Sequence, residues 1–90
     1  MEKDTFKLTP QSIKDIALLK RASIKLVGKV LTLIADIMEH PFEGIGRPEA
    51  LKGDLAGYWS RRIDQKHRLI YKVEDELIII ISCYGHYDDK

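Results

Sequence analysis

The spacing of apolar residues changes near residue 58, and this change constrains the fold more than any other feature of the sequence. In residues 24–39 apolar side chains recur every three or four positions, which is typical of an amphipathic helix. In residues 58–73 apolar and polar side chains alternate, which is typical of a β-strand. We therefore expect helices in the N-terminal half, most strands in the C-terminal half, and an α+β fold.

The N-terminal half begins with signals for a short strand and a helix. Residues 5–8 are predicted to form the strand. Thr9 then offers a side-chain oxygen as an N-cap, and Pro10 suits the first helical position, so a helix is expected to run to about Arg21. Ile13, Ile16, Ala17 and Lys20 follow at the spacing of a helix.

A second helix is predicted after a tight turn at residues 22–23. It should continue to about Glu39, because the pair His40-Pro41 disfavours further helix. Its apolar stripe is expected to pack on the sheet and comprises Ile24, Val27, Val30, Leu31, Ile34, Ile37 and Met38.

Residues 41–57 form the only long connection and contain four glycines and two prolines. Loops of this length in compact domains are usually functional or disordered. Residues 48–52, which read PEALK, are predicted to form one helical turn that begins at Pro48. Such a turn would place Glu49 and Lys52 on one side, because they are three residues apart.

The C-terminal half predicts three strands joined by short turns. Residues 58–63 and 68–73 alternate around a turn at 64–66, and residues 77–84 are nearly all apolar, as in a central strand. A chain of 90 residues has room for one modest core. We expect a single domain over residues 1–90, with two N-terminal helices packed on one face of a small, largely antiparallel sheet.

Charge is distributed unevenly along a chain whose net charge is only +1. Residues 45–72 hold seven Lys or Arg and three acidic residues, a net +4, whereas residues 73–90 hold one lysine and five acidic residues, a net −4. A local basic segment favours a focused contact with an anion. The alternative is a solvated sheet edge whose charges prevent aggregation.

Other sequence features restrict the class of protein. Cys83 is the single cysteine, so no internal disulfide is expected and the thiol should be buried and inert. The N-terminus shows no signal-peptide pattern, and the longest apolar run, residues 77–81, is too short to span a membrane. These features predict an intracellular, reducing compartment, the cytoplasm. The His, Cys and acidic residues lack metal-ligand spacing, so neither a metal nor another cofactor is expected.

A set of polar residues matches the requirements of a ribonuclease that uses no metal. Glu49 and His86 supply a carboxylate and an imidazole for general acid–base catalysis, and Lys52, Arg62 and Arg68 supply cations for a phosphate. Each of these residues, taken singly, is equally typical of an ordinary surface. Trp59 is expected to anchor the core rather than stack on RNA.

The order of these residues resembles that of one known family. The motifs are PFEG (41–44), GRPEALK (46–52), GYWSRRI (57–63), HRLIY (67–71) and the pair His86-Tyr87. They resemble the YoeB/Txe toxins of the RelE/ParE-like superfamily. The resemblance implies a RelE-like microbial ribonuclease fold and the toxin of a type II toxin–antitoxin system. It further implies an endoribonuclease that cuts mRNA in the ribosomal A site without a metal and so inhibits translation.

The resemblance also implies roles for individual residues. It makes Glu49 the general base, His86 the general acid and Arg68 the cation that stabilises the transition state. Lys52, Arg62 and Tyr87 would hold RNA or its phosphates, and His67 is grouped with them as a support for Arg68 rather than a proton donor. Arg61, on the opposite face of its strand, is assigned to structure.

The implied partners are the ribosome with its mRNA, a second copy of the chain in a homodimer, and a YefM-like antitoxin. The antitoxin would lay its C-terminal segment over the active site, and operator DNA would be contacted only through it. Two alternatives stay open. One is a gyrase-inhibiting toxin of the ParE kind, whose members generally lack the Glu/Arg/His set. The other is a catalytically inert partner in an antitoxin–DNA repressor complex.

Overall fold

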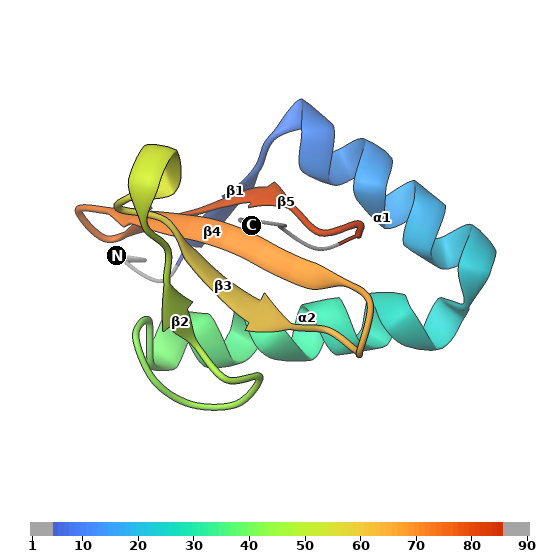
Figure 1. Ribbon diagram of the computed structural model, residues 1–90. Coiled ribbons are helices and arrows are strands. Elements are labelled where there is room, and N and C mark those ends of the chain that lie inside the picture. The colour runs from blue at the N-terminus through green and yellow to red at the C-terminus, as the bar shows by residue number, and fades with distance from the viewer. Residues whose placement is uncertain (1–4, 86–90) are drawn as a thin grey trace.

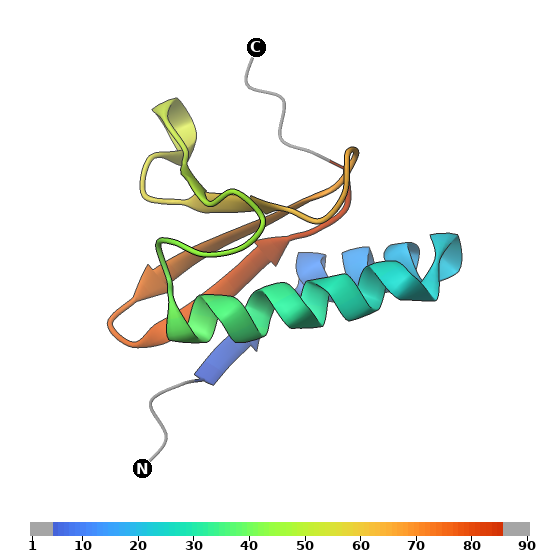
Figure 2. The same ribbon diagram turned by 90° about the horizontal axis from the view of Figure 1, so that it is seen from below.

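The computed structural model describes residues 5–85, which form two helices on one face of a five-stranded sheet (Figures 1 and 2). The strand order is β1-β5-β4-β3-β2; β1 runs parallel to β5 and the other neighbours are antiparallel. This arrangement confirms the predicted α+β fold. The elements are β1 (Thr5–Leu8), α1 (Pro10–Ala22), α2 (Ile24–Glu39), β2 (Glu49–Ala50), the 3₁₀ turn η1 (Gly53–Leu55), β3 (Trp59–Arg62), β4 (Arg68–Glu74) and β5 (Leu77–Ser82).

Helix α1 begins at the cap that the sequence indicates, and helix α2 begins at the predicted turn. The Thr9 hydroxyl oxygen accepts a hydrogen bond from the Ser12 N–H at 3.2 Å, and Pro10 occupies the first turn of α1. Ser23 ends α1 and caps α2, where its hydroxyl accepts from the Lys25 N–H. The helix boundaries therefore agree with the prediction to within a residue.

Of the apolar residues at helical spacing in α1, Ile16 packs against the core, whereas Ala17 is exposed. The buried residues of α1 are Ser12, Asp15 and Leu19, whereas Ile13 is 55% exposed. Asp15 faces inward because its carboxylate accepts the Cys83 N–H at 2.9 Å, just beyond the end of β5. A hydrogen bond to a distant backbone group offsets the cost of burying this carboxylate.

The helix α2 supplies most of the helical side of the core. Val30, Ile34 and Ile37 are buried, as the stripe predicts, and Leu33, which the stripe did not include, is buried as well. Ile24 and Leu31 of the stripe are exposed. The buried residues pack on the inner face of the sheet. The core contains Leu19, Val30, Leu33, Ile34, Ile37, Ile63, Leu69, Tyr71, Ile78, Ile80 and Cys83, and Trp59 packs against it.

The predicted helical turn in residues 48–52 is wrong. Glu49 and Ala50 form the edge strand β2, with Glu49 opposite Ser60 of β3. Two backbone bonds flank this pairing: the Leu51 N–H donates to the Tyr58 carbonyl, and the Arg62 N–H donates to the Gly46 carbonyl. Pairing with β3 thus overrides the local helix preference. In the connection between α2 and β3, helical structure appears only at η1.

Arg61 organises the connection between α2 and β2 from within the protein. Its side chain is fully buried, and each of its five N–H groups has an acceptor. Two acceptors are side-chain oxygens: the carboxylate of Asp36 at 2.5 Å and the hydroxyl of Tyr71 at 3.2 Å. The other three are the backbone carbonyls of His40, Glu43 and Ile45. We call this set the Arg61 network.

Further bonds attach the same loop to the Arg61 network. The Tyr71 hydroxyl donates to the Pro41 carbonyl at 2.7 Å, and the Asp36 carboxylate accepts the Ile45 N–H at 3.1 Å. A Cβ at Gly44 would lie 2.1 Å from the Asp36 carboxylate oxygen, and the φ of +117° there also favours glycine. Burial of this arginine is therefore tolerated because the loop folds around it.

We predict that Arg61→Met lowers the free energy of unfolding by about 3 kcal/mol, the loss typical when one partner of a buried ion pair is removed. The substitution removes the guanidinium donors to the Asp36 carboxylate and to three loop carbonyls. Urea denaturation of the purified chain measures the change.

Arg62→Met is the matched control for this prediction. Its side chain is exposed on the opposite face, so a change below about 0.5 kcal/mol is expected. Equal losses in the two variants would contradict the role of the Arg61 network.

The same network predicts a dependence of stability on pH. The hydrogen bond from Arg61 lowers the pKa of Asp36 below its ordinary value of 3.8. A lowered pKa stabilises the fold fully above the pH at which an unfolded aspartate titrates, and the stabilisation is lost as the pH falls through the folded pKa. The difference in unfolding free energy between wild type and Asp36→Asn should therefore be constant near neutral pH and shrink below about pH 4. A difference that stays constant into acid would contradict this assignment.

Candidate active site

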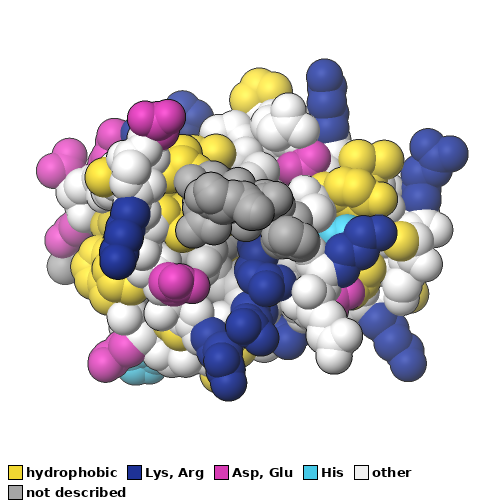
Figure 3. Space-filling view, viewed as in Figure 1, with side chains coloured by type: hydrophobic (Ala, Val, Ile, Leu, Met, Phe, Trp, Pro, Cys, Tyr) yellow, Lys and Arg dark blue, Asp and Glu magenta, His cyan; other side chains and the backbone are white. Residues whose placement is uncertain are grey.

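The strand register collects polar residues on the face of the sheet opposite the helices. Directly opposite residues in antiparallel strands project from the same face. Glu49 faces Ser60, Ser60 faces Ile70, and two positions further along Arg62 faces Arg68. We call this surface the open face; Figure 3 looks onto it and shows Lys and Arg side chains gathered across its middle.

Arg62 and Arg68 stand directly opposite each other, although like charges in this relation destabilise a sheet. Neither arginine forms an ion pair with residues 5–85. Glu49 is a diagonal neighbour of Arg62, about 7 Å away at the backbone, and it too lacks an ion pair with those residues. The arrangement favours an external anion that would neutralise the two arginines.

Arg68 borders a cleft of about 200 Å³ at the end of the sheet. One guanidinium nitrogen, Nη1, donates to the carbonyls of Asp64 and His67, which anchors the side chain to the turn before β4. The cleft is smaller than most pockets for small ligands, which suits contact with part of a larger molecule. Its lining residues are Leu55, Arg68, Ile70, Ile81, Ser82, Tyr84 and Gly85.

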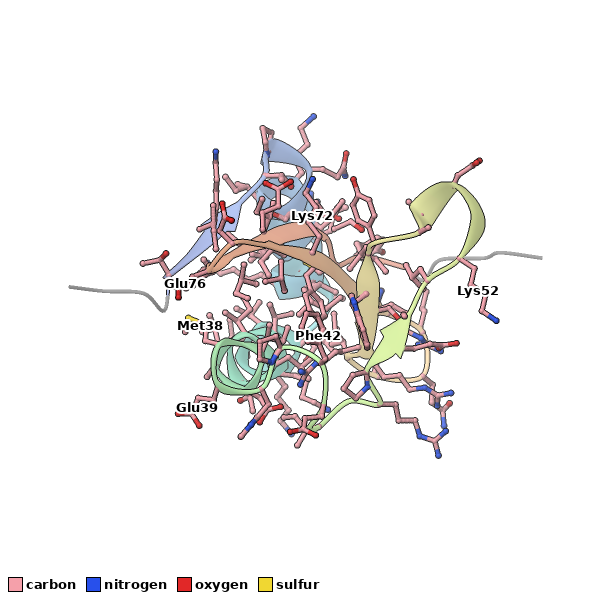
Figure 4. All side chains as sticks on the ribbon, turned by 90° about the vertical axis from the view of Figure 1, so that its left-hand side faces the viewer. Met38, Glu39, Phe42, Lys52, Lys72 and Glu76 are labelled. Atoms are coloured by element: carbon pink, nitrogen blue, oxygen red, sulfur yellow. The ribbon has the colours of Figure 1, made fainter. Side chains whose placement is uncertain are left out.

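Glu49 and Lys52 reach solvent from two different elements rather than from one helical turn. Glu49 is exposed on the edge strand β2, and Lys52 is exposed at the N-cap of η1. Figure 4 shows Lys52 projecting outward, away from α2. Both side chains are therefore accessible to a large substrate.

His67 differs from Glu49, Arg62 and Lys52 in its exposure: it is only 4% exposed, whereas they are exposed. Its Nδ1 accepts a hydrogen bond from the Gly85 N–H at 2.7 Å, and its ring lies 4.7 Å from that of Tyr84. The predicted His86 and Tyr87 lie outside the described residues. Of the predicted site, the open face thus unites Glu49, Arg62 and Arg68.

Comparison with known proteins identifies the family. A family model described as a YoeB-like toxin of bacterial type II toxin–antitoxin systems matches residues 8–87. The chain belongs to this family. It is 54% identical to the toxin YoeB of Streptomyces coelicolor over 63 residues, which cover 70% of this chain and 75% of that protein.

Solved structures of relatives share the fold of this YoeB-family chain. A YoeB/ParE toxin from Agrobacterium tumefaciens is 40% identical, with a TM-score of 0.87 over 92% of this chain and 99% of the other. YoeB from Staphylococcus aureus was solved in a heterotetrameric complex with YefM, at 42% identity and a TM-score of 0.82, covering 91% and 95% of the two chains. It was also solved as a dimer, at 40% identity and a TM-score of 0.85, covering 96% and 100%.

Three further observations concern the cysteine, metal ligands and membrane spans. Cys83 is buried, as predicted, and burial raises the pKa of its thiol to about 12, so it is a poor nucleophile. Within residues 5–85, no three His, Cys, Asp or Glu side chains are grouped as metal ligands. Neither α1 nor α2 has the length and apolarity needed to cross a membrane.

Sequence reasoning missed residues that hold the site in place. Asp36 anchors the loop through Arg61, and its signal was an acid beside the apolar stripe of α2. Asp64 accepts the N–H groups of Lys66 and His67 and so shapes the turn before β4; an aspartate at the start of a turn is the usual signal. Leu55 and Ile70 line the cleft and gave no signal that distinguishes them from core residues.

Proposed function

We propose that this chain is a ribosome-dependent endoribonuclease that cleaves mRNA in the A site and thereby inhibits translation. The observation that carries the proposal is the open face, where Glu49, Arg62 and Arg68 are accessible together in a YoeB-family chain. Two opposed arginines suit a phosphate, and a nearby carboxylate that forms no ion pair within residues 5–85 suits the removal of a proton.

The proposed reaction uses the RNA's own 2′-hydroxyl as the nucleophile and no metal. Glu49 takes the 2′-hydroxyl proton while the 2′-oxygen bonds to the adjacent phosphorus. The bond from phosphorus to the 5′-oxygen breaks, and His86 donates a proton to that oxygen. The products are a 2′,3′-cyclic phosphate and a 5′-hydroxyl, so atoms and electrons balance without a co-reactant.

The cations of the open face supply electrostatic stabilisation in this proposal. Negative charge grows on the phosphoryl oxygens in the transition state, and fixed cations there lower the barrier. Arg68 takes this role because its guanidinium is anchored by turn carbonyls at the cleft. Lys52, Arg62 and Tyr87 are assigned to holding the RNA on either side.

The proposed partners follow from the family. The dimer and the YefM complex of the S. aureus relative support a homodimer and a YefM-like antitoxin for this chain. The antitoxin would cover the open face and would provide the contact with operator DNA. The ribosome and its mRNA are the proposed targets, in the bacterial cytoplasm.

A toeprint on a defined mRNA in a purified translation system tests the proposal. Wild type should produce a new cut in the A-site codon. Glu49→Ala and His86→Gln should each lower the cleavage rate by about 10²–10⁴-fold, the usual contribution of a general base or acid.

Glu43→Ala is the matched control, because Glu43 lies in the same loop and only its backbone carbonyl has an assigned role. Its cleavage should match wild type. No cut by wild type, with growth arrest persisting in cells, would favour a gyrase inhibitor. No cut and no arrest would favour the inert partner.

A further inference from the structure

The segment that follows β5 is held by two side chains and by one backbone hydrogen bond to the first residue of β4. β5 ends at Ser82, and the Cys83 N–H is bonded to the Asp15 carboxylate. Gly85 is held at both of its backbone polar groups: its N–H donates to His67 Nδ1 at 2.7 Å, and its carbonyl accepts the Arg68 N–H at 2.8 Å. Figure 2 shows this segment beside the turn between β3 and β4.

His67 is itself rigidly placed. Its backbone N–H donates to the Asp64 carboxylate at 2.6 Å, and its backbone carbonyl accepts the Ile63 N–H at 2.9 Å. The ring is buried against Tyr84. An N–H directed at Nδ1 requires a lone pair on that nitrogen, so the imidazole acts here as an acceptor.

The two bonds to Gly85 restrain a residue that would otherwise be unusually free. Gly85 has a φ of +75°, in the left-handed region that glycine enters without strain, and apart from Gly85 and its chain neighbours no atom of the described residues lies within 4 Å of its Cβ position. Packing therefore does not fix its conformation. Its conformation is restrained by the bond that Gly85 donates to His67 and the bond that it accepts from Arg68, and Gly85 directly precedes His86 in the chain.

We propose that His67 is a positioning residue: its Nδ1 holds the Gly85 N–H one residue before the general acid His86 in the chain, and the cleavage rate depends on that bond. The inference rests on the proposed function. It replaces the predicted RNA contact of His67, because a ring that is 4% exposed with Nδ1 already bonded has little capacity left for RNA.

An isosteric pair of substitutions isolates the acceptor. In His67→Asn the side-chain oxygen corresponds in position to Nδ1, whereas His67→Leu has the same shape and no acceptor. His67→Phe keeps a ring beside Tyr84 and also has no acceptor. Two measurements are made on each full-length variant: hydrogen exchange of the Gly85 amide by NMR, and kcat and KM for cleavage on programmed ribosomes.

We expect His67→Asn to keep the Gly85 amide protected and to retain most of the cleavage rate. His67→Leu and His67→Phe should lose that protection, and their kcat should fall by about 10- to 100-fold with little change in KM, as for a misplaced catalytic group. Should one of these two variants fail to fold, the other still supplies the comparison with His67→Asn.

Three results would overturn the inference. In the first, the Gly85 amide of wild type exchanges freely. In the second, His67→Phe remains active while His67→Asn does not. In the third, KM rises while the Gly85 amide stays protected, which would indicate direct contact with RNA. Failure of the proposed function itself is distinguishable, because wild type would then cleave nothing while the amide measurement, which needs no RNA, still reports the hydrogen bond. In that case the positioning role falls with the function.

Discussion

The buried guanidinium of Arg61 is the constraint on which the rest of the active face depends. Because all five of its N–H groups are bonded, the loop after α2 must present the carbonyls of His40, Glu43 and Ile45 to one point. The loop then continues into β2, whose pairing with β3 sets Glu49 opposite Ser60. A single buried charge thus determines where the carboxylate of the open face lies.

Arg61 and Arg62 are neighbours on β3 and have different environments, although both are arginines. Successive side chains on a strand project from opposite faces. Arg61 is therefore buried with Asp36 and Tyr71, while Arg62 is exposed opposite Arg68. A shift of register by one residue would exchange the two environments, leaving a charge unpaired in the core.

Local signals were sufficient for the parts of the fold that local contacts decide. The caps Thr9 and Ser23 define the helix starts, and the alternation after Tyr58 reveals β3 and β4. The features that the sequence did not predict concern residues whose structure depends on contacts with distant parts of the chain. Asp15 turns inward because of Cys83, 68 residues away, and residues 49–50 become a strand because β3 lies beside them.

The same distinction applies to the candidate site. Residue type and order were enough to identify Glu49, Arg62 and Arg68 as candidates, but their common face depends on the register of three strands. The bond between His67 and Gly85 joins positions 18 residues apart and leaves no pattern in the sequence. Acceptor roles of this kind become visible only when both groups are placed in space.

The central claim is that the open face activates a 2′-hydroxyl of the RNA, and the chemistry of the cut ends tests it most directly. The two fragments released by wild type on programmed ribosomes can be analysed by mass spectrometry. The account predicts a 2′,3′-cyclic phosphate, or its hydrolysed form, on the upstream fragment and a 5′-hydroxyl on the downstream fragment. A 3′-hydroxyl with a 5′-phosphate would mean that water attacks instead, and would contradict the role given to Glu49.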